Sequence, residues 1–97
     1  MTTEADVILP VLRILNGVET GSLPTGEVRR RVRETLCLSS EDLLPLRNRP
    51  DQRIDQTIRN LKSHRLVAGN PFSEGLLRDI PRGFEITEQG RRLLRGR

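Results

Sequence analysis

The chain has 97 residues, a formal net charge of +4 and a pI near 10.9. Its length fits one domain over residues 1–97 with an aliphatic core, since Phe72 and Phe84 are the only aromatic residues. The single cysteine, Cys37, excludes a disulfide framework, and no run approaches the ~20 apolar residues that cross a membrane. The acidic N-terminus lacks the layout of a secretory signal, so we expect a cytoplasmic protein without a membrane partner.

The N-terminal part of the sequence predicts a first helix over Val7–Leu15. Its apolar residues recur at helical spacing, Asp6 is placed to cap its start, and Asn16-Gly17 supplies a left-handed stop. The following Gly21-Ser22-Leu23-Pro24 is typical of a connector.

A second helix is expected from Gly26 to about Leu36, with Thr25 as its N-cap. Its apolar residues recur every four positions and face the core. Much of its remaining surface is a cluster of arginines, namely Arg29, Arg30, Arg31 and Arg33. A capping pattern then predicts a short helix over residues 40–44.

Residues 51–63 predict a third long helix with two different sides. One side is a narrow apolar stripe at i, i+4 and i+7, formed by Ile54, Ile58 and Leu61. The other side carries side chains that can pair with base edges, namely Gln52, Gln56, Arg59, Asn60 and Ser63. A helix that is held by its stripe and presents amides and a guanidinium outward suits a reader of the DNA major groove. We therefore interpret it as a recognition helix.

The C-terminal third predicts a β-hairpin and a closing helix. Leu66-Val67-Ala68-Gly69 forms a short strand, Phe84-Glu85-Ile86 alternates like a half-buried strand, and residues 69–81 make a long tip. Thr87 caps a last helix over Glu88–Leu94. The expected fold is mainly α with a small β-hairpin, a winged helix-turn-helix whose wing is residues 66–86.

Four landmarks of this order carry a resemblance to a known family. They are Leu9-Pro10-Val11-Leu12-Arg13-Ile14-Leu15 followed by Gly17, Leu43-Leu44-Pro45, the spacing of Arg53 and Leu61, and Gly83-Phe84-Glu85-Ile86-Thr87-Glu88-Gln89-Gly90. Together they resemble the N-terminal winged-helix domain of Mrr-type restriction systems, over nearly the whole chain. The resemblance implies a target-recognition module of a restriction or defence system. It also implies that the DNA being read is chemically modified, because that family acts on modified DNA.

The sequence departs from that family in the wing and in its extent. Arg65 stands where the family usually has a glycine before the wing, and the expected tip from Gly69 to Pro81 is longer. The nuclease half that follows the domain in such systems is not among these residues. The resemblance therefore implies the binding half, with a nuclease domain or subunit as its partner.

Charge and position select the residues expected to contact double-stranded DNA. Residues 27–65 hold ten bases against six acids, which places the positive field around the expected recognition helix. Gln56 and Asn60, one turn apart on its exposed face, are the first candidates for reading bases. The full expected set is Arg49, Gln52, Arg53, Gln56, Thr57, Arg59, Asn60 and Ser63, with Arg78 and Arg82 in the wing.

Some of these basic residues have a second interpretation. Arg53 could instead pair with Asp51 or Asp55 and hold the helix start. The Arg29–Arg33 cluster fits a solvated helix face as well as it fits a DNA contact, whereas Thr25 and the amides after it could bind a phosphate.

No motif in the sequence indicates an enzyme, a cofactor or a metal site. A glycine-rich phosphate loop, a His-Glu-x-x-His pattern and a carboxylate pair are all missing from it, and His64 has no partner at ligand spacing. Two other functions stay open. One is a winged helix that packs on a protein partner without binding DNA, and the other is a stand-alone transcriptional regulator that binds a palindromic site as a dimer.

Overall fold

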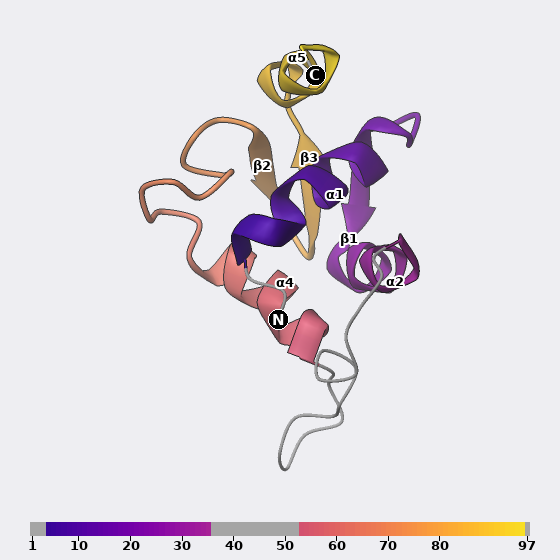
Figure 1. Ribbon diagram of the computed structural model, residues 1–97, viewed down its shortest axis with the longest axis vertical. Helices are drawn as coiled ribbons and strands as arrows, with labels where there is room; N and C mark the ends of the chain where they lie inside the picture. The colour runs from indigo at the N-terminus through magenta and orange to yellow at the C-terminus, as the bar shows by residue number, and fades with distance from the viewer. Residues whose placement is uncertain (1–3, 36–52, 97) are drawn as a thin grey trace.

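The computed structural model describes residues 4–35 and 53–96, which form four helices and a three-stranded antiparallel sheet (Figure 1). In chain order the elements are α1 (Glu4–Asn16), β1 (Ser22–Pro24), α2 (Thr25–Thr35), α4 (Arg53–Ser63), β2 (Leu77–Ile80), β3 (Gly83–Ile86) and α5 (Glu88–Arg95). This mainly α fold with a small sheet is consistent with a winged-helix-like arrangement. The short helix expected at 40–44 lies outside the described residues.

Helix α1 is longer than the sequence predicted and runs through the middle of the core. It begins at Glu4, so Asp6 lies inside the first turn and the prediction that it caps the helix was wrong. Acidic side chains in a first turn interact favourably with the positive end of the helix dipole, which suits this earlier start. The buried face of the helix consists of Val7, Val11, Leu12 and Leu15.

Strand β1 occupies Ser22–Pro24, where the sequence predicted a connector, so that prediction was wrong. It pairs antiparallel with β3, with Leu23 opposite Phe84, and the sheet order is β1-β3-β2. The two backbones approach closely at Gly83, where a Cβ atom would lie 2.5 Å from the carbonyl oxygen of Leu23. Pro24 ends this edge strand, the position in which a sheet tolerates proline.

The wing is a tight hairpin of β2 and β3, not the long one that was expected. Residues 66–69 form turns and not a strand, and the side chains of Leu66 and Val67 are 88% and 57% exposed. Within the hairpin β3 pairs with β2, and Ile80 pairs with Gly83 across the two-residue turn of Pro81 and Arg82. The prediction of a long tip over residues 69–81 was therefore also wrong.

Asn70 organises the chain between α4 and the wing. Its buried side-chain amide donates to the carbonyl oxygen of Leu61 at 2.8 Å and accepts from the backbone N–H of Phe72 at 2.9 Å. These two bonds tie the chain around Asn70 to the end of α4.

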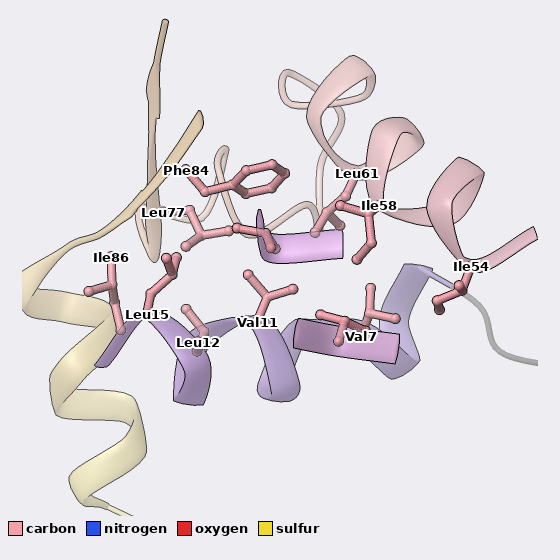
Figure 2. Close-up of a cluster of buried hydrophobic side chains, with 12 residues drawn as sticks. Val7, Val11, Leu12, Leu15, Ile54, Ile58, Leu61, Leu77, Phe84 and Ile86 are labelled. Carbon is pink, nitrogen blue, oxygen red and sulfur yellow. The ribbon is translucent and has the colours of Figure 1, made fainter. Parts of the chain in front are cut away.

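Twelve buried apolar side chains of the described residues form one core between the helices and the sheet (Figure 2). Phe84 of β3 is the largest of them, and its ring centroid lies 5.4 Å from that of Phe72. Thr87 caps α5 as predicted, because its hydroxyl accepts the backbone N–H of Gly90 at 3.0 Å. Helix α5 lies at one end of the molecule, and α2 and α4 lie at the other (Figure 1).

Candidate nucleic-acid interface

Helix α4 is fixed by its apolar stripe and by one ion pair. Ile54, Ile58 and Leu61 are buried as predicted, and Figure 2 shows them directed from α4 towards α1. Beside the stripe, both carboxylate oxygens of Asp55 accept from Arg33 Nη1 of α2 at 2.6 Å. The side chain of Asp55 is 8% exposed and that of Arg33 is 33% exposed. Arg33 is therefore the described partner of Asp55, and this ion pair joins α4 to α2.

Opposite the stripe, Gln56 and Asn60 lie one turn apart and hydrogen-bond to each other. Gln56 Nε2 donates to Asn60 Oδ1 at 2.8 Å. Both residues are half-buried, which is less exposure than the sequence predicted. The Gln56 Oε1 atom is buried and has no hydrogen-bond partner among the described residues. In this arrangement Gln56 orients the Asn60 amide, so Asn60 is the better placed of the two to meet a base.

The other residues expected to contact DNA from this helix differ in their exposure to solvent. Thr57 and Arg59 are half-buried, and Ser63 is exposed at the last turn of α4. Arg53 begins the helix. Arg49 and Gln52 lie outside the described residues.

The arginine cluster of α2 separates into paired and unpaired members. Arg30 donates to Glu27 and, at 2.6 Å, to Glu34, and Arg31 Nε lies 2.9 Å from Glu27. Hydrogen bonds from Arg30 and then Arg31 lower the pKa of Glu27 to about 2 from its ordinary value of 4.5, so this carboxylate is ionised at neutral pH. Within the described part of the chain, Arg29 has no carboxylate partner. Its Nη2 atom lies 3.7 Å from the place that a Cβ of Gly26 would take, so the guanidinium lies over the first turn of α2.

The wing tip touches that same turn of α2. The carbonyl oxygen of Arg82 accepts the backbone N–H of Thr25 at 2.8 Å and its hydroxyl at 3.1 Å. Thr25 is the first residue of α2, and this hydroxyl contact joins the helix to the wing. Arg82 itself is exposed, and none of the described carboxylates pairs with its guanidinium. Arg78 is also exposed but pairs with Glu85 at 3.2 Å.

Lys62 contacts the wing, although it is not among the residues that the sequence predicted for the interface. Its ammonium donates to the carbonyl oxygens of Ile80 at 2.8 Å and Gly83 at 2.7 Å, and lies 3.2 Å from Asp79 Oδ1. It also lies 5.5 Å from the centroid of the Phe84 ring. A signal was present, because Lys62 is the only lysine in a chain rich in arginine. A compact ammonium fits between two carbonyls where a planar guanidinium does not.

The structure thus brings three sets of groups to one end of the molecule. They are the outward side of α4, the first turn of α2 and the turn between β2 and β3, which Figure 1 shows between those two helices. The arginines of α5 lie at the opposite end, where Arg91 donates to Asn16 at 2.7 Å and Arg95 pairs with Glu88 at 2.7 Å.

The described residues offer neither a membrane span nor a metal site. None of their helices has the length and apolar character needed to cross a bilayer. No group of three or more His, Cys, Asp or Glu side chains in them is arranged to hold a metal ion. No family model, curated protein or solved structure matches the chain.

Proposed function

We propose that this domain binds double-stranded DNA, with α4 in the major groove and with α2 and the wing on flanking phosphates. The observation that carries the proposal is the gathering, at one end, of an oriented amide and hydroxyl on α4 with two arginines that lack a described acid partner. An amide and a hydroxyl can hydrogen-bond to base edges, and arginines can pair with phosphates. The described residues give no comparable reason to propose a catalytic reaction.

The outward side of α4 supports base reading. The helix has 11 residues and is about 16 Å long, which fits the width and run of the major groove. Asn60 is held by Gln56 at its oxygen, which directs the amide donors of Asn60 away from that contact. Ser63 lies exposed one turn further along.

The first turn of α2 and the wing tip support phosphate binding. The first N–H groups of a helix have no acceptor inside the helix, and with the helix dipole they favour an anion. Arg29 lies over that turn, and Arg82 is joined to it through its own carbonyl group. A phosphate beside α2 would therefore meet two guanidinium groups that are not neutralised by the described carboxylates.

The biological setting that we propose comes from the resemblance to Mrr-type systems. In that setting the domain is the target-recognition module of a restriction or defence system, it reads modified DNA, and it works with a nuclease domain or subunit. The four sequence landmarks are the support for this part of the proposal.

The experiment is a fluorescence-anisotropy titration of the protein onto a labelled duplex in unmodified, base-methylated and phosphorothioate forms, at several salt concentrations. We expect affinity to fall with salt, with a log–log slope of about −0.9 for each phosphate contact. Arg29→Ala and Arg82→Ala should each reduce that slope by about 1, and Asn60→Ala should weaken discrimination between duplexes more than affinity. Arg92→Ala, which removes an arginine from α5 at the far end, is the matched control and should change neither.

The outcomes separate the possible settings. A preference for one modified duplex supports the modification-reading role, whereas binding of two copies to a palindromic unmodified site supports a dimeric regulator. No binding at low salt contradicts the proposal.

One observation favours the alternative of a protein-interaction module. Leu66 and Val67 are exposed large apolar side chains, and Val67 lines a groove of about 270 Å³ between the start of α1 and residues 67–71. Glu4 and His64, 3.2 Å apart, lie at the same groove. If this surface is the functional one, Leu66→Ser with Val67→Ser should abolish association with a partner and leave DNA affinity unchanged. Sedimentation and anisotropy measure the two effects separately.

A further inference from the structure

The turn at the wing tip is held from both sides by the two helices of the candidate interface. From α2, the backbone N–H and the hydroxyl of Thr25 reach the carbonyl oxygen of Arg82. From α4, the ammonium of Lys62 reaches the carbonyl oxygens of Ile80 and Gly83, the residues that flank the turn. The turn therefore has a fixed position relative to both helices before any ligand is present.

The ammonium of Lys62 is engaged by groups of the domain itself. It donates to two carbonyl oxygens and forms an ion pair with Asp79 Oδ1, 3.2 Å away. Its side chain is 22% exposed and its charge lies against the ring of Phe84. A lysine on a recognition helix would ordinarily be expected to contact the DNA backbone, and these contacts argue against that role.

The body of α4 does not depend on Lys62. Three buried apolar residues hold the helix in the core, and Asp55 pairs with Arg33 on its flank. Loss of the Lys62 ammonium would therefore release the wing from α4 while leaving α4 in place. The group most affected would be the guanidinium of Arg82. Lys62 contacts the carbonyl oxygens of Ile80 and Gly83, and Arg82 lies between these two residues in the chain.

We infer that Lys62 is a positioning residue that couples the recognition helix to the wing, so that the Arg82 contact with a DNA phosphate depends on the Lys62 ammonium. The inference rests on the proposed DNA-binding function. It assigns to Lys62 an effect on affinity that is exerted through Arg82 and not through a contact of its own.

A double-mutant cycle on DNA binding tests this coupling, with Lys62→Met, Arg82→Ala and the double variant. Methionine keeps an unbranched stem of similar length and removes the ammonium. We expect each single variant to bind about tenfold more weakly and the double variant to bind like Arg82→Ala, instead of about a hundredfold more weakly as independent contacts would give. Each variant should lower the log–log salt slope by about 1, and the double variant by about 1 and not 2.

A matched control is available in Arg65. Arg65 Nε lies 3.1 Å from Asp79 Oδ2, so Arg65→Ala removes an ion pair to the same carboxylate without touching the turn carbonyls. Its effect should add to that of Arg82→Ala. Lys62→Arg keeps the charge but not the compact shape, and we expect it to bind like Lys62→Met, whereas a direct phosphate contact would be preserved by arginine.

A measurement on the free protein reports the position of the wing without DNA. The backbone N–H of Arg82 should show an NMR order parameter near the rigid value of about 0.85 in the parent and a lower value in Lys62→Met, with the amides of α4 unchanged. This reading also shows that the variant is folded.

The outcomes distinguish the inference from the function on which it rests. If the parent does not bind DNA, the proposed function fails. If the parent binds and the effects of Lys62→Met and Arg82→Ala are additive, or if Lys62→Arg restores binding, the inference is wrong and the proposed function stands. Non-additive loss together with a mobile wing in Lys62→Met establishes the coupling.

Discussion

Arg82 combines a candidate contact with an unfavourable backbone conformation. It is the one described residue other than glycine with a positive φ, at 60°, and it follows Pro81 in the turn. A proline followed by a residue at positive φ is the combination of a type II turn, in which glycine or asparagine normally takes the second place. Arginine at this place therefore adopts an unfavourable backbone conformation, of the kind that often occurs at binding sites.

The strain at Arg82 allows stability and binding to be separated. Arg82→Ala keeps the left-handed backbone strain, whereas Arg82→Gly removes it, so the glycine variant should be more stable than the alanine variant by about 1 kcal/mol. Both variants lack the guanidinium and should bind DNA equally weakly. Thermal unfolding followed by circular dichroism measures the first effect, and anisotropy measures the second. An alanine variant that is as stable as the glycine variant would show that the turn is not strained.

The pair of Gln56 and Asn60 shows what the sequence could and could not give at this scale. Helical spacing predicted that the two amides lie one turn apart opposite the apolar stripe, and they do. The hydrogen bond between them and the burial of Gln56 Oε1 depend on side-chain rotamers and on the residues packed nearby. Helical spacing carries no information about either. Likewise, the acids beside the arginines of α2 were visible in the sequence, but which arginine would remain unpaired was not.

At the scale of elements, long periodic segments were predictable and short strands were not. The stripe of α4, the alternation in β3 and the Thr87 cap are local patterns, and all three are confirmed. Strand β1 has three residues, too few to show alternation, and its partner β3 is about sixty residues further along the chain. The apolar run at 66–69 has the composition of a strand but forms turns. The actual strand β2 carries Arg78 and Asp79, and such charged residues disfavour the prediction of a strand there.

The contact of β1 with β3 depends on the absence of a side chain at Gly83. A methyl group there would lie 2.5 Å from the carbonyl oxygen of Leu23, which is backbone and cannot turn away. Gly83→Ala should therefore destabilise the domain by about 2 kcal/mol or more, measured by urea denaturation. Gly26→Ala is the control, since it lies in the first turn of α2 with only the end of Arg29 nearby at 3.7 Å, and it should be neutral or slightly stabilising. Equal effects of the two substitutions would mean that the strands can separate without cost.

The ion pair that joins α2 to α4 should respond asymmetrically to removal of its partners. Asp55→Ala leaves Arg33, which is a third exposed and can turn to water, so the cost should be about 2 kcal/mol. Arg33→Ala leaves the carboxylate of Asp55 buried without its cation, and should cost about 3 kcal/mol or more. Urea denaturation of the two variants measures the difference. If Asp55→Ala is the more damaging, the pair does not hold the helices together in the way that the burial indicates.

At the scale of the whole molecule, the charge that matters is not the net charge of +4. Many arginines of the described residues are neutralised by carboxylates close to them, at both ends of the domain. Glu27 pairs with Arg30 and Arg31 at the end that carries α4 and the wing, and Glu88 pairs with Arg92 and Arg95 at the opposite end. Nearby arginines lower the pKa of both carboxyl groups, so both are ionised at neutral pH.

This arrangement permits a test with two variants that change the net charge equally but at different places on the domain. Glu27→Gln and Glu88→Gln each raise the net charge by one, but only Glu27→Gln acts beside the candidate interface, where it frees Arg31 and leaves Arg30 paired with Glu34 alone. We expect Glu27→Gln to raise affinity for any duplex and to steepen the log–log salt slope by about 1, because the freed Arg31 can meet a phosphate. Glu88→Gln should leave the slope unchanged. Anisotropy titrations over a range of salt measure both. If the two variants behave alike, the domain attracts DNA only through its overall field, and the first turn of α2 is not part of the contact surface.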